Sequence, residues 1–253
     1  MMNIIMHGCN GRMGQVITKI VAEDPEVQIV AGVDITGDQL SDYPVFKTIE
    51  DCDVKADVVI DFAHVSGVDH LLDYCVEKKL PLVLCTTGLS KEQLDHVREA
   101  EKSIALLKSA NMSLGINTLA MLLKQATRVL SPAGFDIDIV EQHHNQKLDA
   151  PSGTALLLAD AINEACEEKF DYVYDRSTRR EKRPKKEIGI SSVRGGSIVG
   201  IHEVIYAGLD EVIEIKHTAY SRSVFGKGAV EAAKFLVGKN PGHYDMSDAI
   251  AES

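Results

Sequence analysis

Apolar and polar positions follow two different rhythms along this chain of 253 residues. Up to about residue 112, short and almost wholly apolar runs are separated by longer runs in which apolar residues recur every three or four positions. The first pattern is typical of buried strands and the second of amphipathic helices. The strands predicted from it span 3–7, 27–33, 58–61, 82–85 and 104–108, and the helices between them span 15–23, 65–78 and 90–102.

The rhythm changes in the second half of the chain. Segments with alternating apolar and polar residues predict strands there, and turns at Gly195-Gly196 and Gly208-Leu209-Asp210 favour an antiparallel arrangement of the last three. The predicted strands span 135–142, 188–194, 197–206 and 211–220, and the predicted helices span 114–130, 154–168, 225–237 and 244–251.

These patterns predict an α/β fold in two parts. Short apolar strands that alternate with helices indicate a Rossmann-like, doubly wound parallel sheet. The later strands indicate a second, α+β domain with a mainly antiparallel open sheet. We expect residues 1–112 and 222–253 to form the first domain and residues 113–221 the second. The open face of the second sheet needs a cover, for which a further subunit is the natural candidate.

Composition excludes several classes of protein. No apolar run approaches the roughly 18 to 20 residues that span a membrane. The first residues, 1–8, lack a basic region and lead into a glycine turn, so we expect a strand rather than a signal peptide and a cytoplasmic protein. The five cysteines form no Cys-x-x-Cys pair, which indicates reduced thiols rather than disulfides or a zinc ribbon. A formal charge of -11 disfavours general nucleic-acid binding.

A glycine-rich segment follows the first predicted strand. Gly8, Gly11 and Gly14 open a helix with a variant of the dinucleotide-binding fingerprint, in which glycines let the backbone approach a pyrophosphate. Asp34 ends the second strand, where its carboxylate can accept hydrogen bonds from both ribose hydroxyls of an adenosine. The segment therefore predicts a dinucleotide site.

Ligands of parallel sheets bind beyond the carboxyl ends of the strands. Three further segments lie at such ends and are candidates for the same site: Phe62-Ala63-His64, Cys85-Thr86-Thr87-Gly88 and Ser109-Ala110-Asn111-Met112. Thr86 and Thr87 equally fit a turn that caps the next helix.

Residues 141–154 place proton-transferring groups beside a predicted helix start. The imidazoles of His143 and His144 and the amine of Lys147 come just before it. The helix start itself is Pro151-Ser152-Gly153-Thr154, in which serine is a favourable N-cap and glycine lets a ligand approach the backbone. Unpaired amides of Ser152, Gly153 and Thr154 would bind a carboxylate or a phosphate. The segment therefore indicates chemistry on a small carboxylate.

Two alternatives exist for this segment. It also fits an ordinary capped helix preceded by solvated histidines. A zinc site is disfavoured, because adjacent histidines cannot easily share one metal ion, no cysteine is near, and the spacing His-Glu-x-x-His is absent. We predict no metal.

A basic tract over 176–186 is either a solvated surface loop or a flap that attracts anions.

The chain resembles the 4-hydroxy-tetrahydrodipicolinate reductases, formerly called dihydrodipicolinate reductases, of the bacterial and plant lysine pathway. The resemblance covers nearly the whole length. The motifs that carry it are Gly8-Cys9-Asn10-Gly11-Arg12-Met13-Gly14, Thr86-Thr87-Gly88, Glu141-Gln142-His143-His144-Asn145-Gln146-Lys147 and Asp149-Ala150-Pro151-Ser152-Gly153-Thr154-Ala155.

The resemblance implies NAD(P)H-dependent reduction of a cyclic, unsaturated dicarboxylate in diaminopimelate and lysine biosynthesis, with hydride delivered to ring C4 and net loss of water. It implies that His143 and Lys147 are the catalytic pair. It also implies that the substrate is held by His144, Ser152, Gly153, Thr154 and Thr87. An ammonium at Lys147 would stabilise developing negative charge and supply a proton, and His143, with an intrinsic pKa near ~6.5, would donate or relay one.

For the cofactor, the resemblance assigns the pyrophosphate to residues 8–13 and the ribose to Asp34. Around the nicotinamide it places Cys85, Thr86, Thr87, Ser109, Ala110, Asn111 and Met112. The pyrophosphate residues 8–13, which form the glycine turn, are Gly8, Cys9, Asn10, Gly11, Arg12 and Met13. The family is usually a tetramer formed through the second domain's sheet, so we expect a homotetramer.

The chain departs from the family pattern at two positions. Many relatives have glycine in place of Cys85, which could crowd the cofactor, and many have arginine in place of Ile35. Without that arginine, a 2′-phosphate would face Asp34 with only Arg12 to balance it. We therefore predict that NADH is preferred over NADPH.

Two other functions remain to be discriminated. A semialdehyde or hydroxy-acid dehydrogenase is disfavoured because no cysteine lies in a nucleophile context with a partner base, although Cys85 is near the expected cofactor. A dinucleotide-sensing regulator could use the tract 176–186 on nucleic acid, but no helix-turn-helix pattern accompanies it.

Overall fold

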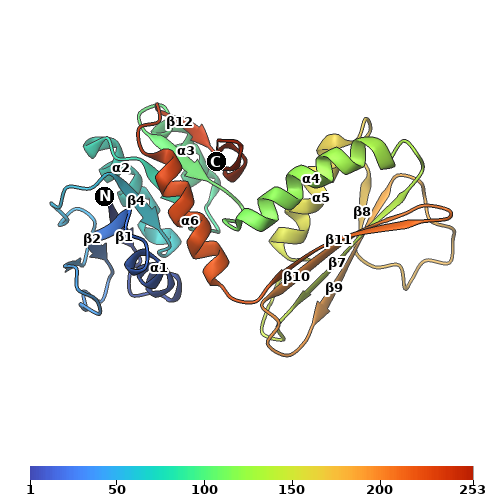
Figure 1. The fold of residues 1–253 in the computed structure, drawn as a ribbon, viewed down its shortest axis with the longest axis horizontal. Coiled ribbons are helices and arrows are strands. Elements are labelled where there is room, and N and C mark those ends of the chain that lie inside the picture. Colours follow the sequence, from blue (N-terminus) through green and yellow to red (C-terminus); the bar gives the residue numbers. More distant parts are fainter. Residues whose placement is uncertain (253) are drawn as a thin grey trace. The chain divides into compact units, whose positions relative to one another are not determined.

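The computed structural model describes residues 1–252 and forms two compact units. Unit 1 consists of Met1–Leu114 and Arg222–Ser253, and unit 2 consists of Gly115–Ser221. Figure 1 labels the elements of both. Each unit has a sheet of its own, covered by its own helices.

Unit 1 contains a seven-stranded sheet in the order β12-β6-β5-β4-β1-β2-β3, and every neighbouring pair is parallel. Its strands are β1 (Met2–His7), β2 (Val27–Val33), β3 (Val45–Phe46), β4 (Val58–Asp61), β5 (Leu82–Leu84), β6 (Ala105–Lys108) and β12 (Gly242–Tyr244). Its helices are α1 (Arg12–Ala22), the 3₁₀ turn η1 (Val65–Gly67), α2 (Val68–Lys78), α3 (Lys91–Ala100), α6 (Ser223–Leu236) and α7 (Met246–Ala251). The strand order reverses between β1 and β4, and this is where doubly wound sheets bind ligands.

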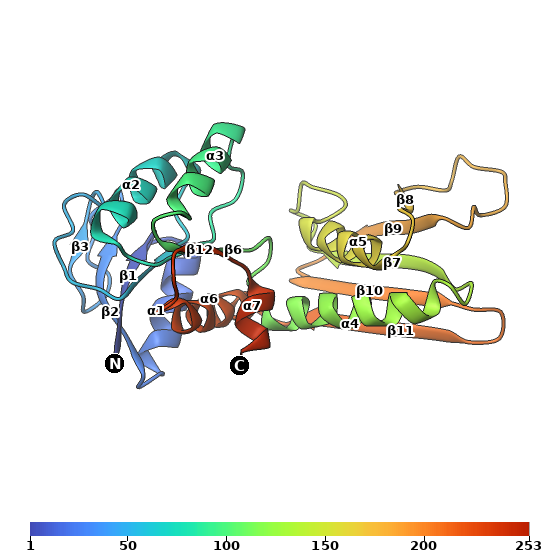
Figure 2. The ribbon, with the colours of Figure 1, turned by 90° about the horizontal axis from the view of Figure 1, so that it is seen from above.

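Alternate residues of β1 feed two hydrophobic layers, because successive side chains of a strand point to opposite faces. Ile4 and Met6 pack with residues of α1 and α6, whereas Ile5 packs with residues of α2 and α3. Figure 2 shows α2 and α3 on one side of this sheet and α1 and α6 on the other. The predicted Rossmann-like parallel sheet is confirmed.

Unit 2 contains a five-stranded sheet in the order β11-β10-β7-β9-β8. Its strands are β7 (Asp136–His143), β8 (Asp171–Val173), β9 (Glu187–Arg194), β10 (Gly200–Ala207) and β11 (Val212–Ala219), and its helices are α4 (Leu114–Leu130) and α5 (Gly153–Ala165). Residues of α4 and α5, such as Leu123 and Leu158, pack on inward side chains of β7 and β10. The second domain is thus α+β, as predicted.

One prediction about this sheet is wrong in part. β10 and β11 are antiparallel as expected, but β9 lies beside β7 and runs parallel to it, so the sheet is mixed. The reason is helix α5, which returns the chain to the starting end of β7 before β9 begins. The glycine turn at 195–196 therefore crosses the end of β7 instead of closing a hairpin with β10.

Most predicted elements agree with the structure to within a few residues. Three short strands, β3, β8 and β12, were not predicted, and β12 together with α7 replaces the single helix expected over 244–251. Strands of two or three residues are too short to show a periodicity.

Candidate active site

The glycine turn after β1 has no room for side chains. Gly8 has a φ of +80°, and a Cβ atom there would lie 2.8 Å from the carbonyl oxygen of Phe62. The turn is closed by a hydrogen bond of 3.1 Å that Gly11 N donates to Gly8 O, after which α1 begins at Arg12. The backbone amides at the start of this helix are therefore not covered by side chains, which is the arrangement that binds a pyrophosphate.

Asp34 lies beside this turn. Its carboxylate accepts hydrogen bonds of 3.2 Å from the amide of Asn10 and from the amide and hydroxyl of Thr36. A cleft of about 590 Å³ opens here. It is lined by His7, Gly8, Asn10, Gly11, Val33, Asp34, Ile35, Thr36, Lys47, Thr48, Ile49, Glu50, Phe62, Ala63, His64, Gly67 and His70. The dimensions and the lining fit the adenosine and pyrophosphate part of a dinucleotide.

Several predicted cofactor residues do not line this cleft. The side chain of Cys9 is fully buried in the core beside α1, and Arg12 is exposed. Thr86 instead donates a hydrogen bond of 3.0 Å to Ala63 O, which ties the end of β5 to the end of β4. The segment 109–112 is held by its own turn, in which Ser109 donates to Asn111 O.

Cys85 is a poor nucleophile in this structure. Burial, and then the negative charge of Asp61, raise its pKa well above that of an ordinary thiol. Because the thiolate is the reactive form, this environment opposes the dehydrogenase alternative that depends on an acyl-cysteine.

In unit 2, Glu141 connects the predicted catalytic residue His143 to Arg194 and to the start of α5. Its side chain is fully buried in β7 and accepts two hydrogen bonds from Arg194, of 2.8 and 2.6 Å, one of 2.6 Å from His143 Nδ1 and one of 3.1 Å from the amide of Ser152. Burial raises the pKa of Glu141, but the hydrogen bonds from Arg194, Ser192 and His143 outweigh burial and lower the pKa to about 2. Glu141 is therefore a carboxylate at neutral pH.

His143 is held in one tautomer by this carboxylate. Its Nδ1 carries the proton that faces Glu141, which leaves Nε2 as the other functional atom. Burial, opposed by Glu141, lowers the pKa of His143 below 6.5. The ring is therefore mainly neutral at neutral pH, because desolvation disfavours the charged form.

The start of α5 agrees only partly with the prediction. Ser152 is the N-cap and accepts a hydrogen bond of 3.2 Å from Ala155 N. Its own amide is not available to a ligand, because it donates to Glu141. Gly153 is exposed, and a Cβ atom there would meet nothing within 4 Å, so an anion can approach the backbone at this residue. Thr154, the next residue, is half-buried.

Lys147 lies on the loop between Glu141 and Ser152. Its Nζ forms an ion pair of 2.8 Å with Asp149, whose side chain is 58% exposed. Lys147 is itself largely covered, and His144 is half-buried. Because one partner of the pair is in water, the ammonium can exchange Asp149 for an anionic ligand at small cost.

His202 is a further residue of this cluster that the sequence interpretation missed. Its ring packs edge-on against His143, with centroids 5.2 Å apart, and its Nε2 lies 3.1 Å from Ser152 Oγ. Burial lowers the pKa of His202 to about 3. Arg194 was missed as well. The sequence does contain a signal for such a cluster. Alternate residues of β7 and β10 face the helices, where apolar side chains are expected, and Glu141, His143 and His202 occupy three of these positions.

Four basic residues of the tract 176–186 are paired with acids. Arg176 and Arg179 form ion pairs with the buried Glu187, and Arg183 donates a hydrogen bond of 2.7 Å to Asp138. Lys186 pairs with Glu168. These contacts support a structural loop anchored to β7 and β9, and they oppose the nucleic-acid alternative, because paired guanidinium groups are not offered to phosphates.

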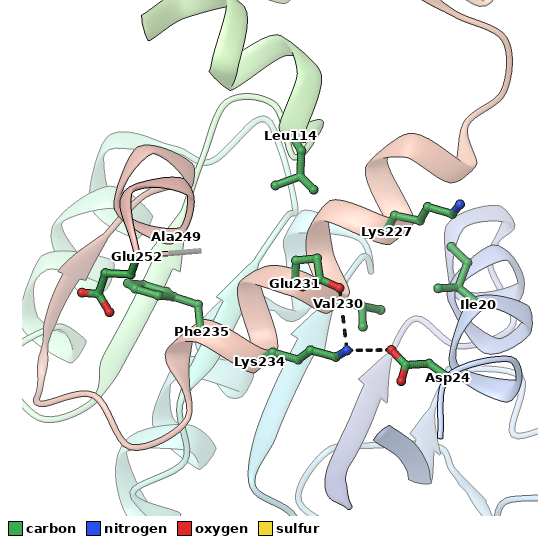
Figure 3. Close-up of a pocket in the computed structure, with 10 residues that line it drawn as sticks. All are labelled: Ile20, Asp24, Leu114, Lys227, Val230, Glu231, Lys234, Phe235, Ala249 and Glu252. Atoms are coloured by element: carbon green, nitrogen blue, oxygen red, sulfur yellow. Dashed lines mark ion pairs between the residues drawn. The ribbon is translucent and has the colours of Figure 1, made fainter. Parts of the chain in front are cut away.

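A second cavity of unit 1, of about 570 Å³, lies along α6 and is lined by apolar and charged residues in equal number (Figure 3). Lys234 forms ion pairs there with Asp24, at 2.7 Å, and with Glu231 (Figure 3). None of the predicted site residues lines this cavity. Within residues 1–252, no cluster of three or more metal-ligating side chains is present, and no helix is both long and apolar enough to cross a membrane.

The doubly wound sheet, the bare glycine turn and the acidic residue after β2 define unit 1 as a dinucleotide-binding fold of the kind found in NAD(P)-dependent oxidoreductases. Family models described as "Dihydrodipicolinate reductase, N-terminus" and "Dihydrodipicolinate reductase, C-terminus" match residues 2–112 and 115–250. The chain belongs to the dihydrodipicolinate reductase family.

Individual relatives agree with this membership. The chain is 54% identical over 250 residues to the 4-hydroxy-tetrahydrodipicolinate reductase of Caldanaerobacter subterraneus subsp. tengcongensis, covering 99% of this chain and 98% of the relative. It is 53% identical over 246 residues to the enzyme of the same name from Clostridium tetani, covering 97% and 96%. A solved structure of dipicolinate-bound dihydrodipicolinate reductase from Paenisporosarcina sp. TG-14 has the same fold, with a TM-score of 0.81, 24% identity and 99% of both chains covered.

Proposed function

We propose that this protein reduces 4-hydroxy-tetrahydrodipicolinate to tetrahydrodipicolinate with a reduced pyridine nucleotide, in the biosynthesis of diaminopimelate and lysine. The family membership over both halves of the chain supports the reaction. The observation in the structure that carries it is Glu141, which holds His143, Arg194 and the start of α5 in one hydrogen-bonded group next to the Lys147 loop.

In this proposal unit 1 is the dinucleotide-binding domain and unit 2 the substrate-binding and oligomerisation domain. The bare turn at Gly8 and Gly11 would hold the pyrophosphate, and Asp34 the adenosine ribose. The residues at 85–87 and 109–112 would surround the nicotinamide. A reduced nicotinamide supplies the hydride when it is bound.

The residues of unit 2 would bind the substrate and manage its charge. Gly153 and Thr154 would fix one carboxylate at the start of α5, where the helix dipole favours an anion, while Ser152 caps the helix. Lys147 and His144 would bind the other polar groups. Once the C4 hydroxyl and a proton from the adjacent ring carbon have left as water, addition of hydride at C4 would build negative charge on the ring as an enamine. An ammonium at Lys147 would stabilise this charge and supply the one proton that neutralises it.

His143 has a different role from Lys147 in this proposal. Since Glu141 keeps a proton on Nδ1 and burial keeps the ring neutral, Nε2 presents a lone pair and not a proton. A Cβ atom at Gly200 would lie 3.2 Å from Nε2, so the glycine keeps this atom open. His143 would therefore accept a hydrogen bond and orient the reacting groups, while Lys147 is the proton donor.

We propose NADH as the preferred cofactor. Ile35, which follows Asp34, is 89% exposed and offers no charge to a 2′-phosphate. The structure adds a cation that the sequence interpretation missed, because Lys47 lines the cleft and its stem lies across Gly37, three residues after Asp34. Asp34 N donates to Phe46 O at 2.9 Å, which brings the two segments together. Lys47 would let NADPH bind as well.

We also propose a homotetramer that forms through the face of the unit 2 sheet turned away from α4 and α5. Partly exposed apolar residues of four strands occupy this face: Val140, Val193, Ile201, Ile205 and Val212. Light scattering after size-exclusion chromatography would give the mass of four chains, and a monomer at micromolar concentration would contradict the proposal.

The test of the reaction is oxidation of NADH, monitored by the loss of its absorbance at ~340 nm. The substrate is the condensation product of pyruvate and aspartate semialdehyde. We expect turnover that depends on this substrate. Oxidation of NADH with a simple aldehyde or hydroxy-acid partner instead would favour the dehydrogenase alternative. A salt-dependent shift of labelled DNA would favour the regulator.

A further inference from the structure

His7 occupies a position in the cofactor cleft that the proposed function does not use. It is the last residue of β1 and directly precedes Gly8, the first glycine of the turn. The residue as a whole is only 8% exposed, yet it lines the cleft. A Cβ atom at Gly67 would lie 3.5 Å from His7 Cε1, so the ring lies between the turn and η1.

One ring nitrogen of His7 is occupied by a buried acid. His7 Nδ1 lies 2.7 Å from Asp61 Oδ1, and Asp61 is the partner of His7 in the β1–β4 register and is fully buried. The same oxygen accepts a hydrogen bond of 3.1 Å from Ala63 N. Because a buried carboxylate accepts hydrogen bonds, Nδ1 carries the proton and Nε2 is left for another partner.

One buried atom of this pair is unsatisfied within residues 1–252. It is Asp61 Oδ2, which has no hydrogen-bond partner, while His7 Nδ1 holds the other oxygen of the same carboxylate and leaves Nε2 for a further contact. A pair whose only purpose was to neutralise a core acid would be expected to leave no such atom, since an unpaired buried polar atom costs about 1 to 3 kcal/mol. A largely buried histidine that lines a cleft beside an unsatisfied carboxylate oxygen instead points to a ligand contact.

We infer that His7 binds the pyrophosphate of the dinucleotide through Nε2. With Nδ1 held by Asp61, a proton on Nε2 makes an imidazolium whose charge Asp61 balances from behind, and Nε2 donates to a phosphate oxygen. The glycine amides and the start of α1 supply neutral donors, and His7 adds a charge-assisted one. The inference rests on the proposed function, because it requires a dinucleotide in this cleft.

The charge of the cleft explains why such a donor is useful. The other titratable side chains that line it are Asp34, Lys47, Glu50, His64 and His70. Glu50 is paired with His70 at 2.8 Å, and the stem of Lys47 lies against Gly37, so neither the pair nor the lysine is placed at the glycine turn itself. A pyrophosphate brought beside Asp61 would be repelled unless a cation stood between them, and His7 is the residue in that position.

The test compares binding of ADP and of adenosine by isothermal titration calorimetry. In His7→Asn the amide nitrogen can replace Nδ1 in the bond to Asp61, but nothing replaces Nε2. We expect ADP to bind about tenfold more weakly than to the wild type, as one charge-assisted hydrogen bond implies, while adenosine affinity stays within about twofold. The matched control is His96→Asn, which alters a similar pair, with Asp69 at 2.8 Å, outside the cleft, and is expected to change neither affinity.

The inference is wrong if His7→Asn binds ADP as tightly as the wild type, or if it loses adenosine and ADP affinity equally. If the wild type itself binds neither ADP nor NADH, the dinucleotide site of the proposed function fails and this inference fails with it.

A measurement on the unmutated protein guards against misfolding of the variant. The ¹⁵N resonance of His7 Nε2 is expected to shift on saturation with ADP, and an unmoved resonance would also overturn the inference.

Discussion

The replacement Glu141→Gln tests whether one buried carboxylate organises the substrate site. Glutamine keeps the shape of the side chain but loses the charge, and its NH₂ group would face a donor from Arg194 or His143. Three groups depend on the carboxylate: the guanidinium of Arg194, the ring of His143 and the amide of Ser152. The replacement therefore leaves at least one buried donor without an acceptor.

The size of the effect follows from the pKa of Glu141. A carboxyl group whose pKa falls from 4.5 to about 2 on folding adds about 3 kcal/mol to the free energy of unfolding at neutral pH. Since the folded pKa is the lower one, this stabilisation is complete above about pH 4.5 and is lost as the pH falls toward 2. Breaking a buried ion pair by removing one partner costs a similar amount, about 3 to 5 kcal/mol.

The assay is urea unfolding of wild type and Glu141→Gln between pH 7 and pH 3, followed by circular dichroism. We expect a difference of about 3 kcal/mol at pH 7 that shrinks steadily below pH 4.5. Glu203→Gln is the matched control, because Glu203 lies on the neighbouring strand and its ion pair with Lys216 is long, at 3.7 Å. It is expected to cost less than about 0.5 kcal/mol. A Glu141→Gln protein as stable as the control at pH 7 would refute the reasoning.

Three further substitutions test the assigned roles. Lys147→Ala is expected to lower kcat by about two to three orders of magnitude with little change in NADH affinity, because it removes the proton donor; a loss below about threefold would remove Lys147 from the mechanism. Asp34→Ala is expected to raise mainly the KM for NADH, about tenfold, and unchanged cofactor affinity would mean that the ribose is bound elsewhere. Lys47→Met is expected to lower kcat/KM for NADPH about tenfold and leave that for NADH unchanged; equal effects on both cofactors would show that Lys47 does not contact the 2′-phosphate.

The parts of the fold that the sequence predicts are those with a local signal. The strands at 27–33 and 58–61 agree with the structure residue for residue, because each is a short apolar run bounded by polar residues. The pairing of β9 was not predicted, since a glycine turn at 195–196 is a local feature, whereas the position of β9 is set by the crossover through α5.

The same distinction applies to the site. His143, Lys147 and Ser152 lie in one continuous motif, so the sequence alone brings them together. Arg194 is 53 residues from Glu141, and His202 is 50 residues from Ser152, so only the folded sheet shows that they meet. The lowered pKa of His143 depends on burial, which residue type does not reveal.

The most direct test of the account is the fate of the hydride. The enzyme would be supplied with NADH deuterated at the transferable C4 position and with the condensation product of pyruvate and aspartate semialdehyde, and the product would be examined by mass spectrometry and NMR. We expect one deuterium per molecule of tetrahydrodipicolinate, at ring C4. A product that carries no deuterium, or carries it at another ring position, would contradict the proposed reaction.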